Sequence, residues 1–301
     1  MKKILRDSRC VFAFCDYDTL EVRTLAQTCI DFKFDDGRSY FADVIRSGKD
    51  VHLDMATETL GGMSYEDALE RYEAGDKLIE DVRQGAKISV YGMSGGMGPD
   101  AFVEYARGYG VEVSRERAGE LHKAYRRKAR EMVEYFAHCS AMCADGGQAD
   151  SVRHPRTGLW RGKIGYTQLA NFYFQNLAAV GATDALFEVV AECVDPTMGS
   201  ALYGCRPWLF NHDEIGMEIP YAAFGPKRAH AAAMRLQTVM IDRMSFWVPD
   251  VPIGATVAMA RRWYKGAKAK FVDGLLVPTR KQGKVWVPDT DDLPGWKRSA
   301  A

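Results

Sequence analysis

A β-hairpin with an acidic tip is the sequence feature that most limits how this chain can fold. Residues 208–211 and 214–219 alternate apolar and aromatic side chains with polar ones, which is typical of paired strands. His212 and Asp213 lie between the two runs, where a tight turn is expected. The pattern therefore predicts an antiparallel hairpin that exposes two neighbouring carboxylates, those of Asp213 and Glu214.

A second strand is predicted near the start of the chain. Residues 11–15 (VFAFC) form a β-branched and aromatic run that ends at Asp16. Residues 20–32 then carry apolar side chains at helical spacing. We therefore expect a strand that runs into a helix, with Asp16 at the junction.

Helical periodicity dominates much of the remaining chain. Four further segments predict helices, and they cover approximately residues 79–90, 122–136, 166–193 and 226–244. The polar stretch 153–163, which includes Arg161, predicts a loop that leads into the third of them. A basic patch at residues 261–270 and a short proline-bounded hairpin are expected near the end.

Composition excludes several classes of protein. The 301 residues include 40 Lys and Arg and 40 Asp and Glu, so the formal charge is zero and net charge alone does not indicate a nucleic-acid partner. A hydrophobic content of 47% excludes a disordered tail, a collagen-like chain and a polytopic membrane protein. The apolar run 11–15 is too short for a signal-peptide core, and we expect a cytoplasmic protein without a membrane partner. Seven scattered cysteines favour reduced thiols rather than a disulfide framework or a zinc site.

The two acidic strand ends suggest metal-dependent phosphoryl transfer. Carboxylates from neighbouring strands, here Asp16 and Asp213, can bridge two Mg²⁺ ions roughly 4 Å apart. One ion would activate an attacking hydroxyl and the other would stabilise the leaving oxygen. The alternative is that each Asp only caps the backbone of its turn, which is common for a lone Asp.

Three residues on the predicted helix 79–90 and just after it could bind a nucleotide. Arg83, Lys87 and Tyr91 are four residues apart, so they share one helix face over roughly 12 Å. Arg83 and Lys87 suit the phosphates of a nucleotide, and Tyr91 suits its sugar. The alternative is an exposed basic helix with one aromatic anchor. The glycines that follow lack the Lys and Ser or Thr of a Walker loop.

Taken together, these patches resemble the motifs of family A (DNA polymerase I type) DNA polymerases, and among them the shorter phage-like forms. The resemblance runs from about residue 11 to about residue 265. Motif A corresponds to residues 16–23, motif B to Arg83, Lys87 and Tyr91, and motif C to residues 212–214. Order, spacing and expected local structure agree in all three.

The resemblance implies a role for each matched residue. The catalytic residues would be Asp16, Asp213, Glu214 and Lys87, and the metal ligands would be Asp16, Asp213 and the backbone carbonyl of Tyr17. The nucleotide would contact Arg83, Lys87, Tyr91, Glu21 and Tyr17. The DNA would contact Asn171, Gln175, His212 and Arg161. Two Mg²⁺ ions, for which Mn²⁺ could substitute, are the implied cofactors. Glu21 would exclude ribonucleotides, and with Glu214 it favours DNA over RNA synthesis.

The resemblance also implies a domain organisation. Residues 1–49 would form the first part of an α/β (α+β) polymerase palm with an antiparallel sheet, 50–164 the helical fingers, and 165–301 the second part of the palm and a C-terminal tail. A thumb and a 3′–5′ exonuclease domain would be absent. We therefore expect the catalytic piece of a split or truncated polymerase in a bacterial or phage-infected cell. A second polypeptide would supply the thumb and cover an unpaired sheet edge or apolar patch near residues 1–15.

The implied reaction is template-directed addition of deoxynucleoside triphosphates to a primer 3′-hydroxyl on primer-template DNA, by a nucleotidyltransferase. The alternatives are a non-catalytic subunit that binds template-primer DNA in a replication complex, and a different metal-dependent enzyme such as a nuclease. The sequence departs from the family at Gly95, where many members carry Tyr, at Thr167, which replaces an Arg, and at Val180, which replaces an acidic residue.

Overall fold

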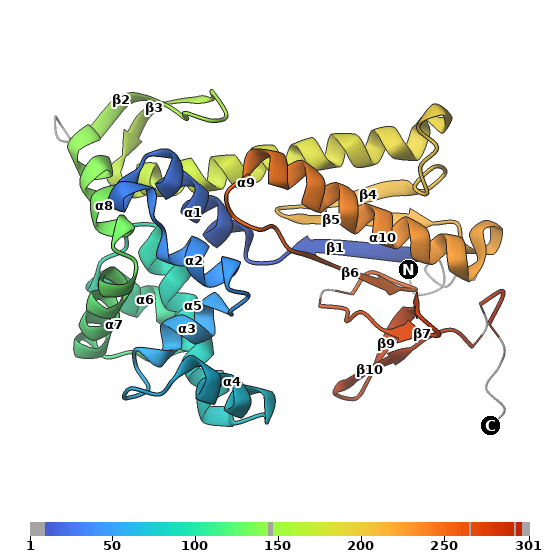
Figure 1. Cartoon of the computed structure of the whole chain (residues 1–301), viewed down its shortest axis with the longest axis horizontal. Coiled ribbons are helices and arrows are strands. Elements are labelled where there is room, and N and C mark those ends of the chain that lie inside the picture. Colours follow the sequence, from blue (N-terminus) through green and yellow to red (C-terminus); the bar gives the residue numbers. More distant parts are fainter. Residues whose placement is uncertain (1–9, 144–146, 265, 292, 297–301) are drawn as a thin grey trace. The chain divides into compact units, whose positions relative to one another are not determined.

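The computed structural model describes residues 10–143, 147–264, 266–291 and 293–296. It divides into two compact units, which Figure 1 shows as ribbons. Unit 1 holds the described residues within 1–20, 178–247 and 253–301, and unit 2 holds the described residues within 21–177 together with 248–252.

A six-stranded sheet forms the centre of unit 1, in the order β10-β9-β6-β1-β5-β4. Every neighbouring pair is antiparallel except β6 and β9, which are parallel. The strands are β1 (Val11–Tyr17), β4 (Arg206–Asn211), β5 (Glu214–Ile219), β6 (Ala255–Ala260), β9 (Pro278–Gln282) and β10 (Val285–Pro288). Two short strands, β7 (Phe271–Val272) and β8 (Leu275–Leu276), form a separate hairpin.

The strand β1 lies inside this sheet and has two different faces. Val11, Ala13 and Cys15 are fully buried, and Tyr17 donates its hydroxyl hydrogen bond to the Met240 carbonyl of α10 (Tyr221–Trp247) at 2.8 Å. Asp16 points to the opposite face, because side chains alternate along a strand. Since β1 pairs with both β5 and β6, the expected unpaired sheet edge is wrong for residues 11–15, while residues 1–9 lie outside the described residues.

Two long helices complete unit 1. The helix α9 (Tyr166–Val194) begins in unit 2, and its residues from 178 onward belong to unit 1. A side chain at Gly181 would lie 2.5 Å from the Met244 sulfur, so this glycine lets α9 and α10 approach closely. Asp184 accepts hydrogen bonds from Arg243 at 2.8 Å and from the Trp247 indole at 2.9 Å, which ties the two helices together. A short 3₁₀ helix, η2 (Pro196–Met198), follows α9.

Unit 2 is mainly helical, as the blue to green ribbons of Figure 1 show. Five of its helices begin at a Ser or Asp whose side chain accepts a backbone N–H of the first turn, which is the preferred N-terminal cap. The elements are α1 (Leu20–Asp31), η1 (Phe34–Gly37), α2 (Tyr40–Arg46), α3 (Val51–Thr57), α4 (Tyr65–Glu73), α5 (Lys77–Ser94), α6 (Pro99–Gly108), α7 (Arg115–Lys128), α8 (Glu131–Met142), β2 (Gln148–Arg153) and β3 (Trp160–Gly165).

The predicted loop over residues 153–163 is confirmed only for 154–159. Residues 153 and 160–163 belong to the hairpin strands β2 and β3, in which Arg161 lies on β3 opposite Val152. Buried His154 organises the connection, because its Nδ1 accepts the backbone N–H groups of Arg156 and Thr157, each at 3.1 Å. These bonds depend on the tertiary placement of one imidazole, and local polarity does not reveal them.

The predicted α/β fold class is confirmed, since a mostly antiparallel sheet is combined with a large helical part. The predicted hairpin around residues 212 and 213 is also confirmed.

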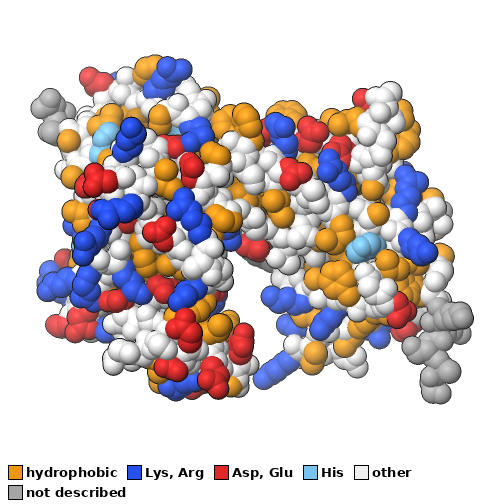
Figure 2. Space-filling model, viewed as in Figure 1, with side chains coloured by type: hydrophobic (Ala, Val, Ile, Leu, Met, Phe, Trp, Pro, Cys, Tyr) orange, Lys and Arg blue, Asp and Glu red, His pale blue; other side chains and the backbone are white. Residues whose placement is uncertain are grey.

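Figure 2 shows that positively and negatively charged side chains are intermixed over the helices of unit 2 and do not form a patch of one sign. Within the described parts of the chain, no helix has the length and apolar character needed to cross a membrane.

Candidate active site

The acidic residues of unit 1 meet where β1 ends and β5 begins. Asp16 is paired with Glu214 in the register of these two strands. Asp213 precedes Glu214 in the turn, and its carbonyl accepts the backbone N–H of Tyr17 at 3.4 Å. The structure therefore brings together the three carboxylates that the sequence placed at strand ends.

Desolvation and the neighbouring carboxylates of this cluster raise the pKa of Asp16. Asp16 is open to solvent on one side, but desolvation of its carboxyl on the protein side and the neighbouring charge of Asp213 raise its pKa to about 7. Glu214 and Asp18 add smaller effects in the same direction. Carboxylates that share negative charge in this way gain from a bound cation.

The turn that carries Asp213 has a specific backbone shape. His212 has a φ of 55°, in the left-handed region that few residues other than Gly, Asn, Asp and His adopt. His212 is exposed and Asp213 is half-buried. The sharp turn thus brings the Asp213 backbone next to the end of β1.

The donor set of this cluster fits Mg²⁺ that is held partly by substrate. Among the described residues, no group of three or more His, Cys, Asp and Glu side chains forms a complete protein cage for a metal. Mg²⁺ usually takes one or two protein carboxylates and completes its shell with water and phosphate oxygens. Asp16 and Asp213 provide such a pair. The Tyr17 side chain is buried against α10, so any ligand from Tyr17 would be its backbone carbonyl.

The predicted stripe of Arg83, Lys87 and Tyr91 lies on one continuous helix, α5, in unit 2. Lys87 is exposed and forms no ion pair within the part of the chain that the structure describes. Arg83 instead donates from Nε and Nη2 to Asp50 Oδ2, at 3.2 and 2.5 Å. The two cations of the stripe therefore differ in their surroundings.

A residue that the sequence analysis did not single out, His52, lies next to the stripe. Its ring centroid is 5.6 Å from that of Tyr91, and its side chain is only 2% exposed. Neither ring nitrogen has a hydrogen-bond partner among the described residues. Burial, together with the positive charges of Arg83 and Lys87, lowers the His52 pKa to about 4 although Asp50 opposes the shift. A lone histidine in a short helix leaves no periodic sequence signal that would have identified it.

Two of the remaining predicted residues of unit 2 form a pair, and a third forms hydrogen bonds with the backbone. Gln175 Nε2 donates to Glu21 Oε1 at 3.4 Å, so the expected sugar-discriminating and DNA-contacting residues are neighbours. Asn171 Nδ2 donates to the carbonyls of Thr167 at 2.8 Å and Gly95 at 3.4 Å. Arg161 is exposed on β3.

Comparisons with known proteins show similarity in structure but not in sequence. No protein-family model matches the chain. No curated protein matches it either. Among solved structures, the chain is similar to the POL domain of Pol1 from M. smegmatis in complex with DNA primer-template and dNTP, with a TM-score of 0.59 and 18% identity. The match covers 84% of this chain and 40% of that chain, so this chain spans less than half of the protein that it resembles. The similarity shows that this chain shares the fold of part of a DNA polymerase domain.

Proposed function

We propose that this chain catalyses template-directed DNA synthesis as a nucleotidyltransferase of the family A, phage-like type. The observation that carries the proposal is the carboxylate cluster of Asp16, Asp213 and Glu214 at two adjacent strand ends of a polymerase-like sheet. A backbone-capping role would not require three acidic residues to meet at one place. The assignment of palm to residues 1–49 and 165–301, and of fingers to 50–164, belongs to this proposal.

The cluster would hold two Mg²⁺ ions, or Mn²⁺, through Asp16, Asp213 and the Tyr17 carbonyl. Bound ions would supply Lewis-acid chemistry at the primer hydroxyl and at the phosphate that accepts it. Asp16 and Asp213 would orient this site, and Glu214 would add negative charge beside it. The raised pKa of Asp16 supports such a role, since it reflects crowding of carboxylates that a cation would relieve.

The stripe on α5 would bind the nucleotide. Arg83 and Lys87 would donate hydrogen bonds to the triphosphate, and Lys87 would neutralise or protonate the departing pyrophosphate. Tyr91 and Glu21 would contact the sugar, with Glu21 occupying the space that a 2′-hydroxyl needs. Lys87 is exposed on the helix, which supports its availability to a ligand.

Primer-template DNA would contact Asn171, Gln175, His212 and Arg161. The amides of Asn171 and Gln175 offer donors to base edges, and His212 and Arg161 are exposed. A second polypeptide that supplies a thumb and an exonuclease is also part of the proposal.

Single-nucleotide extension of a primed template tests the proposal. We expect Asp16→Asn and Asp213→Asn to reduce the rate by at least about a thousandfold, because a lost metal ligand removes several kcal/mol of transition-state stabilisation. Asp273→Asn is the matched control, since Asp273 also lies in a hairpin turn of unit 1, with a φ of 50°. Equal rates in all variants would contradict the metal assignment. Binding of primer-template without any extension by the unaltered chain would favour a non-catalytic DNA-binding subunit instead.

A further inference from the structure

Asp50 holds the Arg83 side chain from the start of a different helix. It is the residue that caps α3, where its Oδ1 accepts the Leu53 N–H at 2.8 Å. Its own N–H donates to the Tyr65 hydroxyl at 2.8 Å. The other carboxylate oxygen, Oδ2, accepts both hydrogen bonds from Arg83. These hydrogen bonds therefore fix the orientation of the Asp50 N–H group and of both carboxylate oxygens.

The contact occupies one edge of the Arg83 guanidinium and leaves the other edge for a ligand. A guanidinium has five N–H donors in a rigid fork, of which Asp50 uses those on Nε and on one side of Nη2. The Tyr72 ring lies 5.2 Å from the guanidinium carbon and supports the same orientation. The side chains of Arg83 and Asp50 are 22% and 34% exposed, so the pair is partly shielded from water but still reachable.

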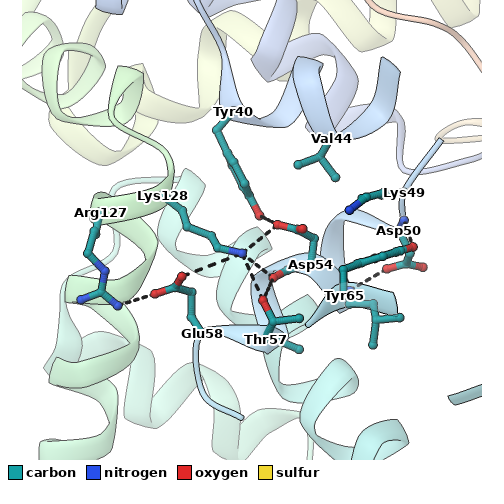
Figure 3. A network of polar contacts seen from close by, with 12 residues as sticks. Tyr40, Val44, Lys49, Asp50, Asp54, Thr57, Glu58, Tyr65, Arg127 and Lys128 are labelled. Atoms are coloured by element: carbon teal, nitrogen blue, oxygen red, sulfur yellow. Dashed lines mark hydrogen bonds and ion pairs between the residues drawn. The ribbon is translucent and has the colours of Figure 1, made fainter. Parts of the chain in front are cut away.

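The helix that carries Asp50 is itself anchored, as Figure 3 shows. Lys128 Nζ, at the end of α7, donates to the Asp54 carbonyl at 2.6 Å, to Asp54 Oδ2 at 2.8 Å and to Thr57 Oγ1 at 3.3 Å. The Tyr40 hydroxyl donates to the same Asp54 Oδ2 at 2.5 Å. These bonds hold α3 between α2 and α7, so Asp50 is presented by a fixed element.

We propose that Asp50 is a positioning residue for nucleotide binding, which orients the Arg83 guanidinium so that its free N–H groups meet the triphosphate. This inference rests on the proposed function. The carboxylate of Asp50 does not contact the nucleotide; it removes most of the rotamer freedom that Arg83 would otherwise lose on binding. Hydrogen bonds from Arg83 and Leu53 hold the Asp50 pKa below its ordinary value despite partial burial, so the pair stays charged at neutral pH.

Electrostatics alone would give Asp50 the opposite effect, and the experiment distinguishes the two. A negative charge beside Arg83 also weakens its attraction for phosphate, so a purely competitive Asp50 would make nucleotide binding tighter when it is removed. A positioning Asp50 makes binding weaker when it is removed. The sign of the change in KM decides between them.

The test uses the full chain, saturating primer-template, Mg²⁺ and a varied concentration of one dNTP. Asp50→Asn and Asp50→Ser both keep a good helix cap while removing the ion pair. The matched control is Asp76→Asn. Asp76 caps α5 through Leu78 at 2.9 Å and accepts Nε and Nη2 of Arg71 at 2.8 and 2.6 Å, so it repeats the same chemistry away from the stripe.

We expect both Asp50 variants to raise the KM for dNTP about tenfold with kcat changed less than about threefold, and Asp76→Asn to leave both constants unchanged. On an Arg83→Ala background, Asp50→Asn should add no further change, because the residue acts through Arg83. An unchanged or lowered KM in Asp50→Asn, or additive effects in the double variant, would overturn the inference alone. Absence of any incorporation by the unaltered chain would overturn the proposed function, and the inference with it.

Discussion

The Asn171 side-chain amide occupies the space that a side chain at Gly95 would need. A Cβ atom at position 95 would lie 2.7 Å from Asn171 Nδ2, which donates to the Gly95 carbonyl. Gly95 has a φ of −80°, so its backbone would accept any residue and only the contact with Asn171 excludes one. The position of Asn171 thereby accounts for a residue without a side chain at position 95.

Gly95→Ala should therefore displace Asn171 without unfolding the chain. We expect the affinity for primer-template to fall several-fold, as it should in Asn171→Ala, because both changes remove the same oriented amide. The double variant should bind no more weakly than either single one. Fluorescence anisotropy with a labelled primer-template measures this. Gly98→Ala is the control, since Gly98 has a φ of −78° and open space around its Cβ position; an equal loss in that variant would contradict the assignment.

Replacement of Glu21 should relax discrimination between sugars. Glu21→Ala removes the carboxylate proposed to exclude a 2′-hydroxyl, and we expect the ratio of ribonucleotide to deoxynucleotide incorporation to rise at least about tenfold. Gln175→Ala removes a hydrogen-bond partner of Glu21, at 3.4 Å, together with a proposed DNA contact, and should change that ratio much less. Parallel kcat/KM measurements with both nucleotides provide the readout. An unchanged ratio in Glu21→Ala would show that Glu21 does not exclude the 2′-hydroxyl.

The buried Glu131 should make stability depend on pH. Burial raises the pKa of its carboxyl from 4.5 to about 7, although bonds from Ser39 and from the backbone of Tyr40 and Phe41 oppose the shift. A raised folded-state pKa means that stability is fully present below about pH 4.5 and is lost as the pH rises toward 7. Because Gln does not titrate, the Tm of Glu131→Gln minus that of the unaltered protein should increase from pH 5 to pH 8, by the equivalent of about 2 to 3 kcal/mol.

Thermal unfolding followed by circular dichroism across this pH range checks the sign. Glu134 provides the control, because it lies on the same first turn of α8 and accepts an exposed bond from the Asp35 N–H at 3.1 Å. Glu134→Gln removes an exposed carboxylate from the same turn and measures how much the substitution itself changes the Tm. A Tm difference for Glu131→Gln that does not change with pH would show that the Glu131 carboxyl is not desolvated as the structure indicates.

Local signals predicted the elements that carry the candidate site, and long-range contacts account for what they missed. Alternation predicted the hairpin around Asp213, and helical spacing predicted α5 with its stripe, because each pattern lies within one element. The pairing of Arg83 with Asp50 joins two helices and the burial of His52 depends on packing, so neither has a signal in local periodicity. The meeting of Asp16 and Asp213 was inferred from two acidic strand ends and from the resemblance, and no local pattern carries it, since β1 and β5 are about two hundred residues apart in sequence.

Salt dependence of DNA binding should be shallow for this chain. The basic end of α7 is engaged within the protein, because Arg127 pairs with Glu58 and Lys128 pairs with Asp54. A formal net charge of zero also gives the chain no overall attraction to phosphates. Each phosphate contact contributes about 0.9 to the slope of log affinity against log salt, and we expect a slope of magnitude below about 4. Binding should accordingly be weak and synthesis distributive, with a large gain if a second polypeptide adds phosphate contacts.

Two substitutions separate a phosphate contact from a structural cation. Arg161→Ala should reduce the slope by about 1, because Arg161 is exposed on β3 and proposed to contact DNA. Arg127→Ala should leave the slope unchanged, because its charge is already paired with Glu58. Titrations of labelled primer-template over a salt series give both slopes, and extension in the presence of excess unlabelled DNA reports processivity. A steep slope that falls in Arg127→Ala would show that Arg127 binds phosphate despite its ion pair. Long products from this chain alone at physiological salt would show that the isolated chain binds DNA tightly enough for processive synthesis.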